Sequence, residues 1–308
     1  MTRRTFIGTG AAVTGAMTLA AAGPDAAAAQ TPLDVRFGLN LLVYTAAFGK
    51  DQVDLIRKVA DFGYDGVEIP FNDLDLLDAE ATRKAREAAN VGLTACAVLM
   101  PGMDLVSADA AERKAGVAHL KRCADITAAM GGNAVAGPLY APVGKLTGRA
   151  RTEDEWKRGV EGLRAAAEHA ATVDILLAIE PLNRFETYFI NTAHDAVQMA
   201  EEVDHPNLKV QIDTFHANIE EKSVGAAVRH AAPYLKHLHA CENDRGIPGS
   251  GHVAWTEFFD AVAAIGYDGW MTIESFGFSL GEMSAAAAIW RDLAPTPEAI
   301  PFEGVKFL

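Results

Sequence analysis

The sequence predicts an α/β protein built as a single (β/α)8 barrel, the TIM barrel. From Val35 onward, short apolar runs rich in β-branched residues alternate with longer alanine-rich stretches of helical period, in eight successive units. The length of 308 residues, with 50% hydrophobic content, accommodates one barrel of roughly 250 residues. No linker or shift in composition divides the chain beyond its first thirty residues. We therefore expect one folded domain there.

The expected strands are short and alternate with helices along the chain. Eight segments have the composition of buried parallel strands: Arg36–Leu42, Gly66–Pro70, Thr94–Leu99, Ala134–Gly137, Leu176–Glu180, Lys209–Asp213, His237–Ala240 and Trp270–Glu274. Seven segments between them have the period of amphipathic helices: Gln52–Asp61, Ala79–Ala89, Ala110–Ala129, Glu153–Ala171, Ala193–Val203, Val224–Ala232 and Trp255–Ile265. Parallel strands joined by helices predict a closed sheet with helices outside it.

Glycine stands at the expected helix ends. Gly63, Gly92, Gly131 and Gly266 each follow a helical stretch, where a residue in the left-handed conformation closes a helix before the next strand. A two-domain, doubly wound sheet is the competing architecture. It is disfavoured because no GxGxxG motif opens a helix after a strand.

Residues 1–29 predict an export signal, which leaves residues 30–308 as the barrel domain. Arg3 and Arg4 precede a mildly apolar, Gly/Ala/Thr-rich run, and the Ala26–Ala29 stretch offers small residues for cleavage. This arrangement resembles a twin-arginine signal, so we expect a periplasmic or extracellular protein. A disordered alanine-rich leader with two accidental arginines is the alternative. No segment reaches the roughly 20 apolar residues of a membrane span, so none is expected in the mature protein.

Charge and cysteine content narrow the class of protein further. The formal net charge of −14 argues against a nucleic-acid partner, which would require a basic face. Cys96, Cys123 and Cys241 are odd in number and widely spaced, unlike a disulfide framework or a CxxC-type zinc site. We expect three reduced thiols in the core of a protein that binds a small molecule.

Four polar residues end four consecutive expected strands. Glu180, Asp213, His239 and Glu274 each follow an apolar run, and the C-terminal ends of barrel strands converge on one site. Three carboxylates and one imidazole form a hard ligand set that suits Mn²⁺, Mg²⁺ or Co²⁺. Buried carboxylates are costly unless a metal or a partner offsets their charge. The pattern therefore predicts a divalent-metal site at this end of the barrel.

Two further polar residues lie on the same strands. His237 is two residues before His239, so both side chains share a face; His239 is nearer the strand end and His237 is expected in a layer below it. Glu68 ends the second strand. It is compatible both with a hydrogen bond into the site and with a structural role inside the barrel.

Three segments give the chain a family resemblance. Ala178–Glu186, Val210–Glu221 and His237–Arg245 closely resemble segments of ketose 3-epimerases of the D-tagatose 3-epimerase type, within the xylose-isomerase-like TIM barrel superfamily. The resemblance covers the whole body from the first strand. It implies that the four strand-end residues hold a divalent ion, usually manganese. It also implies contacts with a sugar substrate by three residues: Glu186, His216 and Arg245.

These residues lead to a hypothesis for the reaction. Glu180 and Glu274 would flank carbon 3 of a ketose, one removing its proton and the other returning a proton on the opposite face, through an enediolate. An aldose–ketose isomerase of the hydroxypyruvate isomerase kind and an exported keto-glycoside epimerase or lyase are the alternative enzymes. A non-catalytic, exported sugar-binding barrel is the alternative outside enzymes. A homodimer and a homotetramer both remain open.

Overall fold

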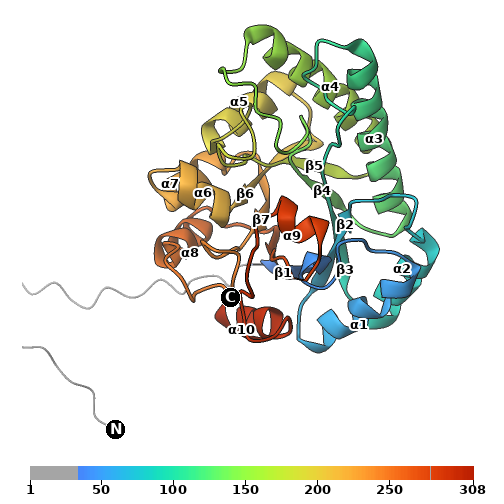
Figure 1. Cartoon of the computed structure of the whole chain (residues 1–308), viewed down its shortest axis with the longest axis vertical. Coiled ribbons are helices and arrows are strands. Elements are labelled where there is room, and N and C mark those ends of the chain that lie inside the picture. Colours follow the sequence, from blue (N-terminus) through green and yellow to red (C-terminus); the bar gives the residue numbers. More distant parts are fainter. Residues whose placement is uncertain (1–33, 278) are drawn as a thin grey trace, which may run out of the picture. The chain divides into compact units, whose positions relative to one another are not determined.

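The computed structural model describes residues 34–277 and 279–308, and these form the predicted barrel (Figure 1). Eight parallel strands pair in sequence order, and β1 (Arg36–Asn40) also pairs with β8 (Trp270–Ile273), which closes the sheet. The predicted fold class is confirmed. The predicted export signal, residues 1–29, lies outside the described residues, as do residues 30–33. Within the part of the chain that is described, no helix has the length and apolar character needed to cross a bilayer.

Strands and helices alternate as expected. The remaining strands are β2 (Gly66–Phe71), β3 (Gly92–Ala97), β4 (Ala134–Gly137), β5 (Leu176–Ile179), β6 (Leu208–Asp213) and β7 (Leu235–His239). The helices are α1 (Asp54–Asp61), α2 (Ala79–Ala89), α3 (Ala110–Ala129), α4 (Glu153–Thr172), α5 (Ala193–Val203), α6 (Thr214–Glu220), α7 (Val224–Ala231), α8 (Trp255–Ala264), α9 (Glu282–Ala286) and α10 (Ala299–Phe307). Two short 3-10 turns, η1 (Leu41–Val43) and η2 (Lys50–Gln52), follow β1.

Some boundaries differ from the sequence-based prediction for local reasons. The strand β1 ends at Asn40, two residues early, because the Asn40 side chain accepts a hydrogen bond from the backbone N–H of Leu42 and begins η1. The helix α6 was not predicted. It begins directly after β6, because the Asp213 carboxylate caps it by accepting the N–H of Phe215. Helices α9 and α10 were also not predicted, and both follow β8.

The prediction that Gly92 closes a helix is wrong. Asn90 instead takes the left-handed conformation after α2, with a φ of 56°, and Gly92 is the first residue of β3. Gly92 and its β2 neighbour Gly66 both lie against the indole of Trp270 on β8. A Cβ atom at Gly92 would come within 2.5 Å of that ring, so the glycine makes room for the indole. Gly63, Gly131 and Gly266 do have positive φ.

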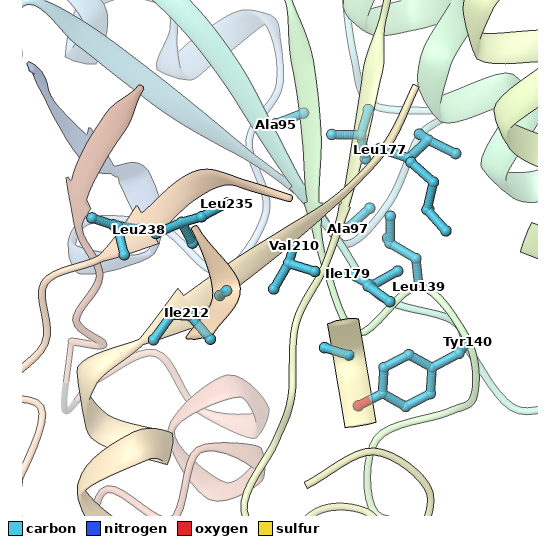
Figure 2. Packing of buried hydrophobic residues seen from close by; sticks show 14 of the residues in the cluster. Ala95, Ala97, Leu139, Tyr140, Leu177, Ile179, Val210, Ile212, Leu235 and Leu238 are labelled. Atoms are coloured by element: carbon cyan, nitrogen blue, oxygen red, sulfur yellow. The ribbon is translucent and has the colours of Figure 1, made fainter. Parts of the chain in front are cut away.

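Residues on one face of the strands belong to the apolar core of the domain. Leu177 and Ile179 on β5, with Val210 and Ile212 on β6, are buried in one continuous hydrophobic cluster that includes Tyr140 (Figure 2). These residues alternate along each strand with residues of the opposite face. The alternation leaves the other face free to carry polar groups.

The barrel interior is polar where the site lies. Glu68, Thr94, Gln211, His237 and Thr272 come from five strands, and each is at most 1% exposed. TIM barrel interiors are more often filled by branched apolar side chains. Buried polar groups require partners, so this interior constrains how the strand ends can be arranged.

An extra residue in β7 determines which face of the sheet His237 and His239 occupy. Val210 pairs with Leu235 and the next β6 residue, Gln211, pairs with His237, so Lys236 is left without a partner in β6. Lys236 is exposed, whereas His237 and His239 are fully buried. This bulge shifts the alternation by one residue and turns both imidazoles into the barrel.

The three cysteines are free and buried, as predicted. Burial raises the pKa of the Cys123 thiol on α3 to about 12. Cys96 on β3 and Cys241 after β7 are also buried. None of the three therefore acts as a disulfide partner in this fold.

We predict that Gly92→Ala lowers the free energy of unfolding by about 1–3 kcal/mol, because the added methyl overpacks the site of the Trp270 indole. Urea unfolding monitored by circular dichroism measures the change. The matched test places Gly92→Ala in a Trp270→Phe background, where the smaller ring leaves space and the cost shrinks. An equal cost in both backgrounds would show that the indole is not the constraint.

Candidate active site

The structure brings the four predicted strand-end residues together. Glu180 directly follows β5, Asp213 ends β6, His239 ends β7 and Glu274 directly follows β8. Each of the four residues is between 0% and 6% exposed. Parallel strands open at one end of the barrel, so the four groups meet at its C-terminal face.

His239 is the centre of the arrangement. Its Nδ1 atom lies 3.5 Å from an oxygen of Glu274 and 3.9 Å from an oxygen of Glu180. Its Nε2 atom lies 2.7 Å from Glu68 Oε1 on the opposite side of the ring. The imidazole is therefore held by one carboxylate and presents its other nitrogen to two more.

Asp213 divides its two oxygens between structure and site. Oδ1 accepts the N–H of Phe215 and caps α6, while Oδ2 accepts a hydrogen bond of 2.6 Å from Nη1 of Arg245. The same Nη1 also donates to Glu274 over 3.0 Å. Arg245, predicted as a substrate contact, thus sits between two of the predicted ligands and is itself 5% exposed.

The loop after β7 holds Arg245 in an unusual conformation. Arg245 has a φ of 64°, which L-residues other than glycine rarely adopt. The buried carboxylate of Glu242 anchors this loop by accepting the N–H groups of Asn243, Gly249 and Val253. It also accepts the indole N–H of Trp255.

His216 and Glu186, the other two predicted substrate contacts, are linked through Asn183. The Asn183 backbone N–H donates to Nδ1 of His216 over 3.1 Å, and its side-chain amide donates to Glu186 over 2.7 Å. A neutral His216 therefore carries its proton on Nε2, which lies 3.1 Å from Nη2 of Arg245. All seven predicted site residues thus belong to one connected cluster.

Three members of this cluster were not predicted from the sequence. Asn40 ends β1 and donates to Glu68, and its amide also lies 3.3 Å from Glu274. A polar residue at a strand end was the signal, but the strand was predicted to run on to Leu42. Asn183 lies within the Ala178–Glu186 segment that carries the family resemblance, but no role was predicted for it. Cys241 was interpreted only as a core thiol, yet its sulfur lies 3.1 Å from Arg245 Nη1.

The pKa values of the two predicted acid/base carboxylates are shifted in opposite directions. Burial raises the pKa of Glu180 well above its ordinary value. Burial also acts to raise the pKa of Glu274, but the charges of His239 and Arg245 outweigh it and lower the pKa. Environments that separate two carboxyl pKa values are typical of acid/base pairs.

The pKa values of His239 and His216 are also shifted in opposite directions. Burial acts to lower the pKa of His239, but the carboxylates of Glu68 and Glu274 raise it well above the ordinary value. Burial lowers the pKa of His216, and the charges of Arg245 and His239 lower it further. His216 is therefore neutral at physiological pH.

The cluster has the donors of a divalent-cation site. Single donor atoms of Asp213, His239, Cys241 and Glu274 lie within 4.8 Å of one another, and Glu180 forms a second such group with Asp213 and His216. Glu180 Oε1 and His239 Nδ1 are among ten buried side-chain atoms of the described residues that have no hydrogen-bond partner. A carboxylate oxygen and an imidazole nitrogen left without partners, next to other carboxylates, fit a cation such as Mn²⁺, Mg²⁺ or Co²⁺.

Comparison with known proteins agrees with this geometry. The sequence pattern of the xylose isomerase-like TIM barrel family matches residues 56–299. A protein named "Probable ketose 3-epimerase" from Synechocystis sp. is 35% identical over 89% of this chain and 96% of its own length. An L-ribulose 3-epimerase from Mesorhizobium japonicum is 35% identical over 84% of this chain and 88% of its own.

A solved structure shows the same architecture. D-allulose 3-epimerase from Methylomonas sp., in complex with D-allulose, superposes with a TM-score of 0.84 at 29% identity. The match covers 90% of this chain and 96% of that one. The chain therefore belongs to the xylose isomerase-like TIM barrel family and groups there with the ketose 3-epimerases, which are carbohydrate isomerases.

Proposed function

We propose that the protein inverts carbon 3 of a ketose by removing the proton there with one carboxylate and returning a proton with another. The observation that carries the proposal is the placement of Glu180 and Glu274, two buried carboxylates that reach the same imidazole from β5 and β8. These strands are not neighbours in the barrel, so the two groups approach the site from different sides. The names of the relatives support the same reaction.

The proposal includes a divalent ion, most simply Mn²⁺, with Mg²⁺ or Co²⁺ as alternatives. Glu180, Asp213, His239 and Glu274 would hold it. When bound, such an ion supplies positive charge that stabilises the oxygens of the sugar as carbon 3 loses its proton. The unpartnered Nδ1 of His239 and Oε1 of Glu180 support this assignment.

The proton transfers belong to the two glutamates. One carboxylate takes the proton from carbon 3 and leaves an enediolate, and the other, in its acid form, delivers a proton to the opposite face. Epimerisation is reversible, so Glu180 and Glu274 exchange these roles between the two epimers.

His216 and Arg245 would stabilise the oxygen at carbon 2. The Nε2 proton of neutral His216 and the Nη2 protons of Arg245 are donors only 3.1 Å apart, and a shared oxygen acceptor satisfies both. Glu186, which Asn183 fixes by a hydrogen bond, would accept a hydroxyl of the sugar.

We predict that Glu180→Gln and Glu274→Gln each lower turnover by about 10²–10⁴-fold, because each removes one proton-transferring group. Resolving ketose epimers by chromatography measures turnover, and deuterium incorporation at carbon 3 in D2O measures proton transfer. Glu201→Gln, on the exposed surface of α5, is the control and keeps full activity. Wild-type turnover in a folded, metal-loaded Glu180→Gln or Glu274→Gln variant contradicts the assignment.

The same assay separates the alternative functions. An aldose–ketose isomerase moves hydrogen between carbons 1 and 2, and a keto-glycoside epimerase or lyase turns over only keto-glycosides. A barrel that merely binds sugar incorporates no deuterium. Assembly as a homodimer or homotetramer stays a prediction, which light scattering during gel filtration checks.

We predict that a chelator abolishes activity and lowers the melting temperature, and that Mn²⁺ restores both. An ion at 100 times its Kd stabilises the folded state by about 2.7 kcal/mol. Asp213→Asn is the informative variant, because an amide oxygen still caps α6 while the charge toward the ion is lost. We expect this variant to fold and to gain no thermal stability from Mn²⁺, as differential scanning fluorimetry measures. A Mn²⁺-induced shift equal to that of the wild type would remove Asp213 from the ligand set.

We also propose that the twin-arginine segment exports the protein, so that it acts on a periplasmic or extracellular sugar. Arg3 and Arg4 before the Gly/Ala-rich run support this. We predict that a double variant, Arg3→Lys with Arg4→Lys, stays in the cytoplasm at its full length. Cell fractionation with immunoblotting detects this, and a Lys121→Arg variant controls for the level of expression. Export of the double variant at the wild-type rate contradicts the proposal.

A further inference from the structure

Glu68 is a fully buried carboxylate that the mechanism above does not use. It lies in the middle of β2, and not at the strand end where it was predicted. All six residues of β2 are buried, and Glu68 is itself 0% exposed. A buried carboxylate is strongly unfavourable unless its oxygens are paired. Each oxygen of Glu68 indeed contacts two groups.

The partners of Glu68 come from three other strands. Oε1 accepts from the Asn40 amide over 2.9 Å and lies 2.7 Å from His239 Nε2. Oε2 accepts from the Thr94 hydroxyl over 3.0 Å and lies 2.7 Å from His237 Nε2. The carboxylate therefore ties β1, β3 and β7 to β2.

The contact with His239 determines which ring nitrogen is free. An ionised carboxylate only accepts hydrogen bonds, so the neutral imidazole, the form that binds an ion, keeps its proton on Nε2 and its lone pair on Nδ1. Nδ1 is the atom that points toward Glu180 and Glu274. A ligating histidine commonly gives its second N–H to a carboxylate, which fixes the ring and strengthens the ligand.

A second arm runs from Glu68 to Glu274. The Asn40 amide nitrogen donates to Glu68 and lies 3.3 Å from Glu274 Oε1. The amide oxygen of Asn40 accepts the N–H of Leu42, so the amide cannot turn over without losing that bond. Glu68 thereby orders both the imidazole and one of the proton-transferring carboxylates.

Glu68, His237 and His239 could be read as a cation site of their own, since their donor atoms are close together. The distances argue against it. Both Glu68–His contacts are 2.7 Å, a hydrogen-bond distance, whereas two ligands of one tetrahedral zinc ion are roughly 3.3 Å apart. These contacts are too short to place an ion between the carboxylate and either imidazole.

The geometry points to Glu68 as a positioning residue that sets the affinity of the site for its divalent ion, by holding His239 with Nδ1 toward the ion and, through Asn40, by holding Glu274. This inference rests on the proposed function, because it takes His239 and Glu274 as ligands of that ion.

The test is the binding of Co²⁺ alone, measured by calorimetry and by the visible spectrum of the bound ion, without substrate. We expect Glu68→Gln, which keeps the shape but loses the charge, to weaken the Co²⁺ Kd by about 10–100-fold and to change the spectrum. Leu120→Ala, which empties a fully buried position on α3, is the stability control. It lowers the melting temperature and leaves both the Kd and the spectrum unchanged.

The outcomes separate the inference from the proposed function. Wild-type Co²⁺ affinity and spectrum in folded Glu68→Gln overturn the inference and leave the metal site standing. If the wild-type protein binds no Co²⁺, the metal-dependent function and the inference both fail. If Glu68→Gln does not fold, Glu68→Asp replaces it, because the shorter side chain withdraws its carboxylate from His239. An unchanged Co²⁺ Kd and spectrum in that variant likewise overturn the inference.

Discussion

The structure depends on compensating the negative charge of carboxylates that are buried together inside the barrel. Carboxylates that meet in a water-poor interior repel one another, and each loses hydration that only a close partner replaces. Four of them converge here: Glu68, Glu180, Asp213 and Glu274. The described groups in close contact with them are the guanidinium of Arg245 and the imidazoles of His237 and His239.

The guanidinium of Arg245 is held at a structural cost. Arg245 has a left-handed backbone conformation, which costs on the order of 1 kcal/mol for a residue with a side chain. Glu242 offsets this cost with several hydrogen bonds to the surrounding loop. Strain of this kind persists where the surroundings over-determine a conformation, and it is common at functional sites. The loop after β7 is thus shaped around one guanidinium.

Much of this arrangement could be predicted from the sequence. The eight strands were recognisable because each is a short apolar run, and polar residues at their ends indicated Glu180, Asp213, His239 and Glu274. The roles of Glu68 and Asn40 could not be decided in the same way. Their partners lie on other strands, and a strand pattern gives no distances across a barrel.

The errors have equally local causes. Gly92 was placed at a helix end because glycine favours positive φ, but here it is needed for the close approach of an indole from β8. The turn that ends β1 depends on a side-chain hydrogen bond of Asn40, which an apolar run cannot reveal. Lys236 also gave no signal, since a bulge depends on the register of two strands.

The bulge at Lys236 has a consequence for design. An ideal strand of even alternation, pairing with β6 residue by residue, would place His239 on the other face of the sheet, among the helices. A designer who transplants the four strand-end residues onto a regular barrel must therefore carry over the irregular β7 with them. The bulged backbone of β7 is therefore part of the site, because the orientation of His237 and His239 depends on its extra residue.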